Sequence, residues 1–361
     1  MKITRRLVAA GFPAVLLAQS NSSETRVAFV GVGNRGAQLA KTLATIPNAK
    51  IVAVADVNAA RAAEIAKLYD GAAVYTDFRK MLDERKDIDV VIIATPVNTH
   101  KDVAIAVLEM GRHVYLEKPV AINPEECAQV ATAAKTAKGI LQVGLQLRHD
   151  PARAAGIKFI QQGKLGKVIY LHATRHGGDL PHDAAWYFDR TKSGDIIVEQ
   201  AVHIIDIMVW AAGGPPVRAM GSGGINLYKD DPAGRTSMDN WSAIWEWADG
   251  KRLNMSQIYF DPPGFSGSHE RVFGTEGAID MATGVFHPRG RREPGIRLEI
   301  DPALNKDATY NSLSAFLDNA RGRKKPLNDI ESAQQSTLVA MMARKAIYEG
   351  RVVVWAEMLR R

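Results

Sequence analysis

The chain has 361 residues, of which 46% are hydrophobic and 24% charged, so it is long enough for two soluble globular domains. The net charge is +7, but basic residues are interleaved with acidic ones and form no patch of the kind that binds nucleic acid. No apolar run is long enough to span a membrane in the mature chain, and the single cysteine, Cys127, cannot form an internal disulfide.

Residues 1–20 have the pattern of an export signal. Lys2, Arg5 and Arg6 precede a mostly apolar stretch that ends in small residues. The pair Arg5–Arg6 resembles a twin-arginine signal, which favours a periplasmic or exported protein. The alternative is a frayed N-terminus without signal function, in which case the protein is cytoplasmic.

Residues 25–147 alternate between strand and helix patterns. Near-continuous apolar runs predict buried strands, and stretches with helical spacing separate them. The predicted strands are 26–33, 50–57, 89–95, 113–119 and 140–145, and the predicted helices are 36–46, 58–69, 99–111 and 123–139. This alternation predicts an α/β domain, in which helices cover both faces of a parallel sheet.

Residues 148–361 predict a second domain of the α+β class. Strand-like stretches in series are flanked by helical ones, and Asp249–Gly250 has the composition of a hairpin turn. The predicted helices are 151–166, 194–214, 312–321 and 331–349, and the predicted strands are 167–177, 217–228, 240–250, 251–260 and 269–281. No internal repeat or low-complexity linker separates the two domains.

A glycine-rich motif, "GVGNRG", follows the first predicted strand. It matches the G-x-G-x-x-G pattern, it opens a helix, and an aspartate ends the next strand. This context is the one that a dinucleotide-binding turn requires, because the pyrophosphate lies against the glycines and the helix N-terminus. The residues of this predicted cofactor site are Gly31, Gly33, Asn34, Arg35, Gly36 and Asp56.

Asp56 bears on the choice of cofactor. Its carboxylate can accept hydrogen bonds from the ribose hydroxyls and would repel a 2′-phosphate, so NAD is favoured over NADP. Arg35 and Arg61 could each neutralise an added phosphate, so NADP remains possible.

Two further strand ends carry polar residues, at "ATP" and "LEKP". Ligands of open α/β sheets bind beyond the carboxyl ends of the strands, so we expect these residues to face the nicotinamide half of the cofactor. A lysine there can hydrogen-bond a substrate hydroxyl and stabilise the developing negative charge on its oxygen. The residues concerned are Thr95, Pro96, Asn98, His100, Glu117 and Lys118.

The predicted helix 194–214 carries charged groups in an apolar sequence. Glu199 and His203 are four residues apart and share a face, and Asp206 follows three residues later. Two interpretations stay open: a buried hydrogen-bonded cluster that holds the domain together, or an acid/base pair.

Taken in order, "GVGNRG", "ATPVNTH", "EKP", "GDIIVEQAVHIID" and "VFGTEGAI" resemble the Gfo/Idh/MocA oxidoreductases. The resemblance implies a Rossmann domain followed by a domain with a large, mostly antiparallel open sheet, whose outer face often builds homodimers or homotetramers. It implies that Lys118 is the active-site lysine, with a cis peptide before Pro119, and that His203 is the acid/base. Glu199 stands where many members have Asp, and "SGD" where three glycines are common.

The resemblance implies an NAD(P)-dependent dehydrogenase that transfers a hydride between nicotinamide and a hydroxyl or carbonyl carbon of a sugar, cyclitol or sugar acid. His203 would take the hydroxyl proton, with Glu199 tuning or orienting the site. The alternative is an exported enzyme that keeps NAD in a closed redox cycle, as a sugar–sugar oxidoreductase or an NAD-dependent glycoside hydrolase or lyase. A non-catalytic binding protein is disfavoured by Lys118 and His203. Candidate substrate contacts are Arg148, His149, His176, Asp179, His182, Trp186 and Tyr259; no metal-ligand spacing is present.

Overall fold

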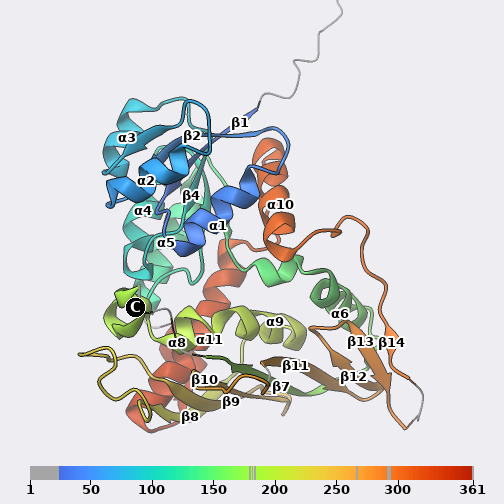
Figure 1. Ribbon diagram of the computed structural model, residues 1–361. Helices are drawn as coiled ribbons and strands as arrows, with labels where there is room; N and C mark the ends of the chain where they lie inside the picture. Colours follow the sequence, from blue (N-terminus) through green and yellow to red (C-terminus); the bar gives the residue numbers. More distant parts are fainter. Residues whose placement is uncertain are drawn as a thin grey trace, which may run out of the picture.

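The computed structural model describes residues 24–359 except 179, 181, 183, 266 and 291–293. The predicted signal and Asp179 therefore lie outside the described residues. Two sheets form the two halves of the molecule, one above the other in Figure 1. The segments coloured blue to cyan build the upper half, and the green to orange segments build most of the lower half.

The first sheet is the predicted dinucleotide-binding fold. Its six strands are all parallel and lie in the order β3-β2-β1-β4-β5-β6. The strands are β1 (Thr25–Val30), β2 (Ala49–Ala55), β3 (Ala73–Tyr75), β4 (Val90–Ile93), β5 (His113–Leu116) and β6 (Leu141–Val143). The helices are α1 (Asn34–Leu43), α2 (Ala59–Ala66), α3 (Phe78–Glu84), α4 (His100–Glu109) and α5 (Pro124–Thr136), with η1 (Val97–Thr99) before α4.

Local sequence explains where these helices begin. Asn58 and Asn123 cap α2 and α5, and Pro124 occupies the first position of α5, where a missing N–H costs no hydrogen bond. β3 and α3 were not predicted, because residues 70–88 give only a short, half-buried strand and a single short helix.

The second sheet is large, open and mostly antiparallel, as expected. Its order is β14-β13-β12-β11-β7-β10-β9-β8-β15, and only the β7–β10 pair is parallel. The strands are β7 (Val168–His176), β8 (Arg218–Gly224), β9 (Asn240–Glu246), β10 (Arg252–Ile258), β11 (Ser268–Gly274), β12 (Gly277–Asp280), β13 (Val285–Pro288), β14 (Ile296–Arg297) and β15 (Val353–Val354). The helical elements are η2 (Gln146–His149), α6 (Pro151–Gln161), η3 (Ala185–Phe188), α7 (Arg190–Ser193), α8 (Ile196–Glu199), α9 (Val202–Ala212), α10 (Ala308–Gly322), α11 (Ile330–Glu349) and α12 (Trp355–Met358).

The predicted helix 194–214 is interrupted. α8 ends at Glu199, Gln200 and Ala201 form a turn, and α9 begins at Val202. In a continuous helix the carbonyl of Glu199 would accept the N–H of His203. Here Lys118 Nζ donates to that carbonyl at 2.7 Å instead. The interruption therefore turns a backbone oxygen of this apolar segment toward the first domain.

One helix departs from the predicted domain division. α10, which follows the second sheet in sequence, packs through Leu313, Phe316 and Leu317 into the apolar core beside β1, β2 and α1. Arg321 extends this contact, since its guanidinium donates to Thr25 Oγ1 at 3.0 Å and to the Asn48 carbonyl at 3.0 Å. The chain thus returns to the first domain after leaving it, and residues 308–322 belong by packing to that domain.

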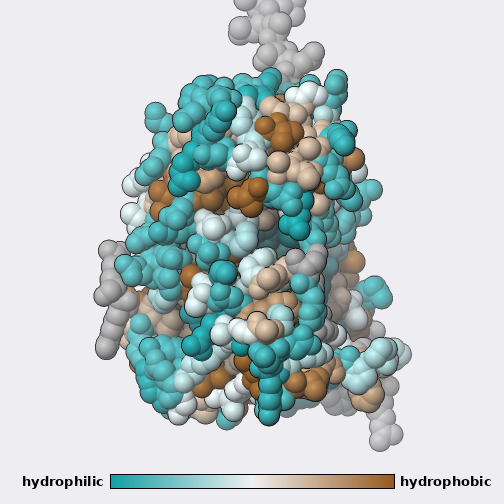
Figure 2. All heavy atoms as spheres, turned by 60° about the vertical axis from the view of Figure 1, so that its left-hand side comes forward, coloured by the Kyte–Doolittle hydropathy of each residue, from teal (hydrophilic) through white to brown (hydrophobic). Residues whose placement is uncertain are grey.

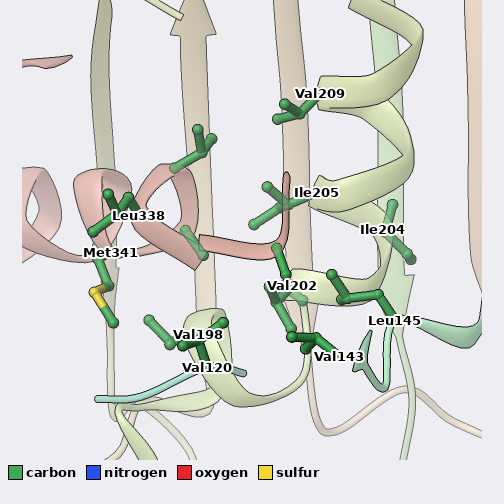
Figure 3. Close-up of a cluster of buried hydrophobic side chains, with 14 of the residues drawn as sticks. Val120, Val143, Leu145, Val198, Val202, Ile204, Ile205, Val209, Leu338 and Met341 are labelled. Carbon is green, nitrogen blue, oxygen red and sulfur yellow. The ribbon is translucent and has the colours of Figure 1, made fainter. Parts of the chain in front are cut away.

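A continuous core joins the two halves. Figure 3 shows Val120, Val143 and Leu145, from the strand ends of the first sheet, beside Val198 and Val202 of α8 and α9. Leu338 and Met341 of α11 complete the cluster. These buried side chains fix the strand ends of the first sheet against the interrupted helix.

None of the helices in the described part of the chain combines the length and the apolar character that crossing a membrane requires. Hydrophilic residues cover most of the face seen in Figure 2, and hydrophobic ones are scattered among them. α8, α9 and α11 cover the sheet face that is turned toward the first domain. A homodimer or homotetramer built on the opposite face stays a prediction.

Candidate active site

The glycine motif forms a cradle that fits a pyrophosphate. Gly31 has φ +85°, and a Cβ there would lie 2.8 Å from the backbone of Ala94. A Cβ on Gly36 would lie 2.2 Å from the Gly31 carbonyl, so both glycines are required by close packing. Gly33 differs, because its Cβ would meet nothing within 4 Å. Gly33 also precedes α1 without a side-chain cap, which leaves N–H groups at the helix start for an anion.

Asp56 lies beside this cradle in a fixed orientation. Its Oδ2 accepts the N–H of Val32 at 2.8 Å, and its Oδ1 accepts the N–H of Asn58 at 2.8 Å. Each carboxylate oxygen keeps a lone pair for a ribose hydroxyl. Arg35 does not serve as a partner for a 2′-phosphate here, because its Nε donates to Glu117 Oε1 at 2.8 Å. The residues present therefore fit NAD.

Asp56→Ala is expected to raise the KM for NAD about 10- to 100-fold, the range for losing hydrogen bonds to a charged group. The same substitution should lower the preference for NAD over NADP, because the repulsion between the carboxylate and a 2′-phosphate is lost. Steady-state kinetics with both nucleotides measure this change, with the exposed Asp70→Ala as control. Equal use of NADP and NAD by the unaltered protein would contradict the assignment.

The "ATP" loop is held by its own side chains. Thr99 Oγ1 donates to Thr95 Oγ1 at 2.7 Å and lies 2.8 Å from the Pro96 carbonyl. Asn98 lies half-buried in the short helix η1. Thr95, Pro96 and Asn98 thus lie at the carboxyl end of β4, where they were expected, and their contact with the cofactor stays a prediction.

His100 corrects an expectation. It is 1% exposed, with Nδ1 2.8 Å from the Pro119 carbonyl and Nε2 3.0 Å from the Thr95 carbonyl. Burial lowers the pKa of this imidazole. Both ring nitrogens face backbone carbonyls of the two strand-end loops, so His100 ties these loops together and does not face a ligand.

Glu117 and Lys118 point to different partners at the end of β5. Glu117 is 4% exposed and holds Arg35 on α1, while the N–H of Lys118 donates to Glu117 Oε2 at 3.1 Å. A Cβ on Gly144 would lie 2.9 Å from the Glu117 carboxyl carbon, so only glycine leaves room for this group. Glu117 is therefore a positioning residue. The Lys118–Pro119 peptide is cis, as expected.

Lys118 reaches across to the second domain. Its Nζ donates to the Glu199 carbonyl at 2.7 Å and forms an ion pair with Glu199 Oε1. Gln200 Nε2 donates to the other oxygen of that carboxylate. Lys118 is 9% exposed and Glu199 is 3% exposed. A buried ion pair with its remaining lone pairs satisfied fixes the ammonium in place.

His203 lies in the same charged centre, at the second residue of α9, directly after the helix interruption. Burial, followed by the positive charges of Lys118 and Arg175, holds the pKa of His203 well below 6.5. The imidazole is therefore neutral near pH 7. Within the described part of the chain, its Nδ1 is buried and has no hydrogen-bond partner. A neutral imidazole with an unsatisfied nitrogen is suited to receive a hydroxyl proton.

Three other residues singled out in the sequence, Arg148, His149 and Asp206, are buried in contacts between elements of the second domain. Arg148 is 5% exposed and forms a two-pronged ion pair with Asp206, at 2.6 and 2.8 Å. Ser336 Oγ donates a hydrogen bond to Asp206 Oδ1 at 2.6 Å. His149 is 5% exposed, and burial together with Arg148 lowers its pKa to about 4. These contacts hold η2 against α9 and α11, and they do not present Arg148 as a substrate contact.

His176 also corrects an expectation. Strand residues alternate between sheet faces, and His176 shares its face with Thr174 and Ser256. Its Nε2 lies 3.0 Å from Ser256 Oγ, on the face opposite α8 and α9. Arg175, one residue earlier, lies on the helix-covered face with the buried Leu171 and Ala173, and the structure brings it to the charged centre. Strict alternation along this strand could have singled it out.

Tyr259 lies near Arg175, and Trp186 is linked to Tyr259 through Tyr187; their contact with a substrate stays a prediction. Tyr259 is 8% exposed, and Gln257 Nε2 donates to its hydroxyl at 3.1 Å. Arg175 acts electrostatically on this hydroxyl. The half-buried Trp186 stacks on Tyr187 with ring centroids 4.0 Å apart, and Tyr187 acts electrostatically on Tyr259. His182 is exposed and lies 3.9 Å from Asp231.

Comparison with known proteins agrees with this architecture. A family model described as "Oxidoreductase family, NAD-binding Rossmann fold" matches residues 25–145, and the GFO/IDH/MocA C-terminal domain matches residues 157–280. A scyllo-inositol 2-dehydrogenase (NAD(+)) of Bacillus subtilis is 31% identical over 264 residues, which are 72% of this chain and 74% of that protein.

Two further similarities bear on fold and chemistry. A 2,7-anhydro-N-acetylneuraminate hydratase of Mediterraneibacter gnavus is 30% identical over 280 residues, covering 74% of this chain and 70% of that protein. A levoglucosan dehydrogenase solved in complex with NADH and levoglucosan superposes with a TM-score of 0.80 over 91% of this chain and 99% of that one. At 20% identity this last similarity shows the shared fold.

The fold and the cofactor cradle define an NAD-binding oxidoreductase with a second, sheet-based domain. The chain belongs to the Gfo/Idh/MocA family. As the motifs implied, it is an NAD-dependent enzyme of that family.

Proposed function

We propose that this enzyme oxidises a CH–OH group of a sugar, cyclitol or sugar acid, and reduces the corresponding carbonyl in the reverse direction. One observation carries the proposal. The ammonium of Lys118 is fixed by Glu199 beside a neutral His203 with an unsatisfied nitrogen, at the carboxyl ends of the NAD-binding strands. The relative named as a scyllo-inositol 2-dehydrogenase supports the substrate class.

Bound NAD would supply the hydride acceptor, held by the glycine cradle and Asp56. Lys118 donates a hydrogen bond to the substrate oxygen and stabilises the negative charge that develops there. His203 accepts the hydroxyl proton, which leaves the imidazole charged until the proton passes to solvent. Glu199 holds the ammonium in position and balances its charge. In the reduction direction His203 takes a proton from solvent and donates it to the oxygen.

Formation of reduced nicotinamide on mixing the enzyme with NAD and a substrate tests this proposal. A suitable panel contains myo-inositol, scyllo-inositol, levoglucosan, D-glucose, D-galactose and the uronates of the last two. We expect reduction with at least one member and none with the Lys118→Met variant. Tight NAD binding without turnover of any CH–OH compound would argue against the assignment.

A second candidate function uses the same site in a closed cycle. The twin-arginine pattern of residues 1–20 favours export, and an exported enzyme meets little free NAD. Similarity to a protein named as a hydratase, whose net reaction involves no oxidation, supports a cycle in which this enzyme oxidises its substrate and later reduces it again. Mass spectrometry of nucleotide released from the acid-denatured protein separates the two candidates. Near-stoichiometric NAD favours the closed cycle, and an empty protein favours ordinary exchange of NAD.

A further inference from the structure

Among the described residues, charge pairing around the active site leaves one cation without a carboxylate partner. Each of four neighbouring cations has a carboxylate within ion-pair distance. The pairs are Arg35 with Glu117, Lys118 with Glu199, Arg148 with Asp206, and Arg153 with Glu270. Arg175 also acts electrostatically on His203, yet none of the described residues forms an ion pair with it. A half-buried charge without a counter-ion is costly unless a ligand neutralises it.

Arg175 is positioned to reach a ligand. It lies near the end of β7 on the helix-covered sheet face, in register with Gln257 of β10 and Ser268 of β11. Its Nη2 donates to Gln200 Oε1 at 2.7 Å, and it acts electrostatically on the Tyr259 hydroxyl. Both groups are neutral, and the hydrogen bond to Gln200 leaves donors of the five-donor guanidinium for a ligand. The side chain of Arg175 is only half-buried, so part of it is accessible to a ligand.

A hydrogen-bonded chain connects Arg175 to the reacting centre. Gln200 accepts from Arg175 and donates to Glu199, which in turn pairs with Lys118. An anion on Arg175 would therefore lie close to the group that Lys118 contacts, yet on a separate part of the substrate. This arrangement of two cations, Lys118 and Arg175, suits a small molecule that carries both a hydroxyl and an acidic group.

We propose that Arg175 binds the carboxylate of the substrate, so that the enzyme acts on sugar acids in preference to neutral sugars or cyclitols. The planar guanidinium matches a carboxylate in a two-pronged contact, and one such cation balances a single negative charge. The Tyr259 hydroxyl, on which Arg175 acts electrostatically, is a further polar group beside it. This inference rests on the proposed dehydrogenase function and narrows the substrates of the enzyme to one class, the sugar acids.

The test compares matched substrates in Arg175 variants. The substrate pairs are D-glucuronate with D-glucose and D-galacturonate with D-galactose, with D-glucose 6-phosphate as a second anion. We expect Arg175→Gln to lower the acid-to-neutral ratio of kcat/KM by about 10- to 100-fold, the loss typical of a charged hydrogen bond. The loss should fall on KM, because the carboxylate is bound equally in ground and transition states. Arg175→Lys should restore part of the ratio.

The control is Arg289→Gln, which removes an exposed arginine after β13 and should leave the ratio unchanged. An unchanged ratio in Arg175→Gln, or a wild-type preference for neutral sugars, would overturn the inference. A preference for the phosphate that depends on Arg175 would also overturn the carboxylate assignment.

A second measurement separates this inference from the proposed function. The increase in melting temperature that glucuronate causes in the presence of NAD measures binding of glucuronate, whether or not it is oxidised. Stabilisation by glucuronate that is absent in Arg175→Gln supports the inference even when no reduced nicotinamide forms. Stabilisation that is the same in both proteins contradicts it even when the enzyme is an active dehydrogenase.

Discussion

Replacing Lys118 by Met lowers kcat by about a thousandfold in our account, because the variant loses the donor at the oxygen where charge develops. The ammonium contacts both the carbonyl and the carboxylate of Glu199, so it is held before substrate arrives. Such a fixed donor acts on the transition state more than on the bound substrate. The effect should therefore appear in kcat, with little change in the affinity for NAD.

The single substitution also leaves Glu199 buried without its partner, which can destabilise the fold by about 3–5 kcal/mol. The double variant Lys118→Met/Glu199→Gln removes both charges and serves as the control for folding. It should recover most of the melting temperature while activity stays low. Recovery of activity together with stability would show that Lys118 acts only through the fold.

His203→Gln should lower kcat/KM for oxidation by about 10²- to 10⁴-fold, the usual contribution of a general base. Glutamine keeps a polar side chain of similar reach but cannot take a proton at neutral pH. Burial and the charges of Lys118 and Arg175 favour the neutral imidazole, which is the form that a base requires. Steady-state oxidation kinetics of the variant measure the loss.

The pH profile distinguishes this role from a structural one. Because the pKa of His203 is depressed below 6.5, the base is active at pH 7 and is lost by protonation only at lower pH. The acid limb of kcat/KM should therefore lie below pH 6.5 and disappear in His203→Gln. An acid limb that persists in the variant, or that lies above pH 6.5, would assign the proton to another group.

Sequence patterns predicted the first domain well, because its signals are local. The apolar strands, the asparagine caps and the spacing of Gly31, Gly33 and Gly36 each follow from neighbouring residues. The return of α10 to this domain could not be predicted in the same way. Its buried face is apolar whichever sheet it covers, and only the three-dimensional path of the chain decides between them.

The active site was predicted in part for a similar reason. Residues 194–214 are mostly apolar, so periodicity indicated one helix and gave no sign of the turn at Gln200 and Ala201. At that turn the Glu199 carbonyl accepts a hydrogen bond from Lys118, which is 81 residues away in sequence. Conversely, the sequence analysis named His176 as a candidate substrate contact and did not consider Arg175. Strand alternation places Arg175, and not His176, on the face of the site.

Transfer of a substrate hydrogen to NAD tests the central claim most directly. The best substrate of the panel, deuterated at all its carbon-bound positions, is incubated with the enzyme and NAD. Mass spectrometry then measures the reduced nicotinamide nucleotide. Our account predicts that the nucleotide carries one deuterium and that Lys118→Met forms almost none. Reduced nucleotide without deuterium, or product formed without any labelling of free or enzyme-bound nucleotide, would contradict hydride transfer at this site.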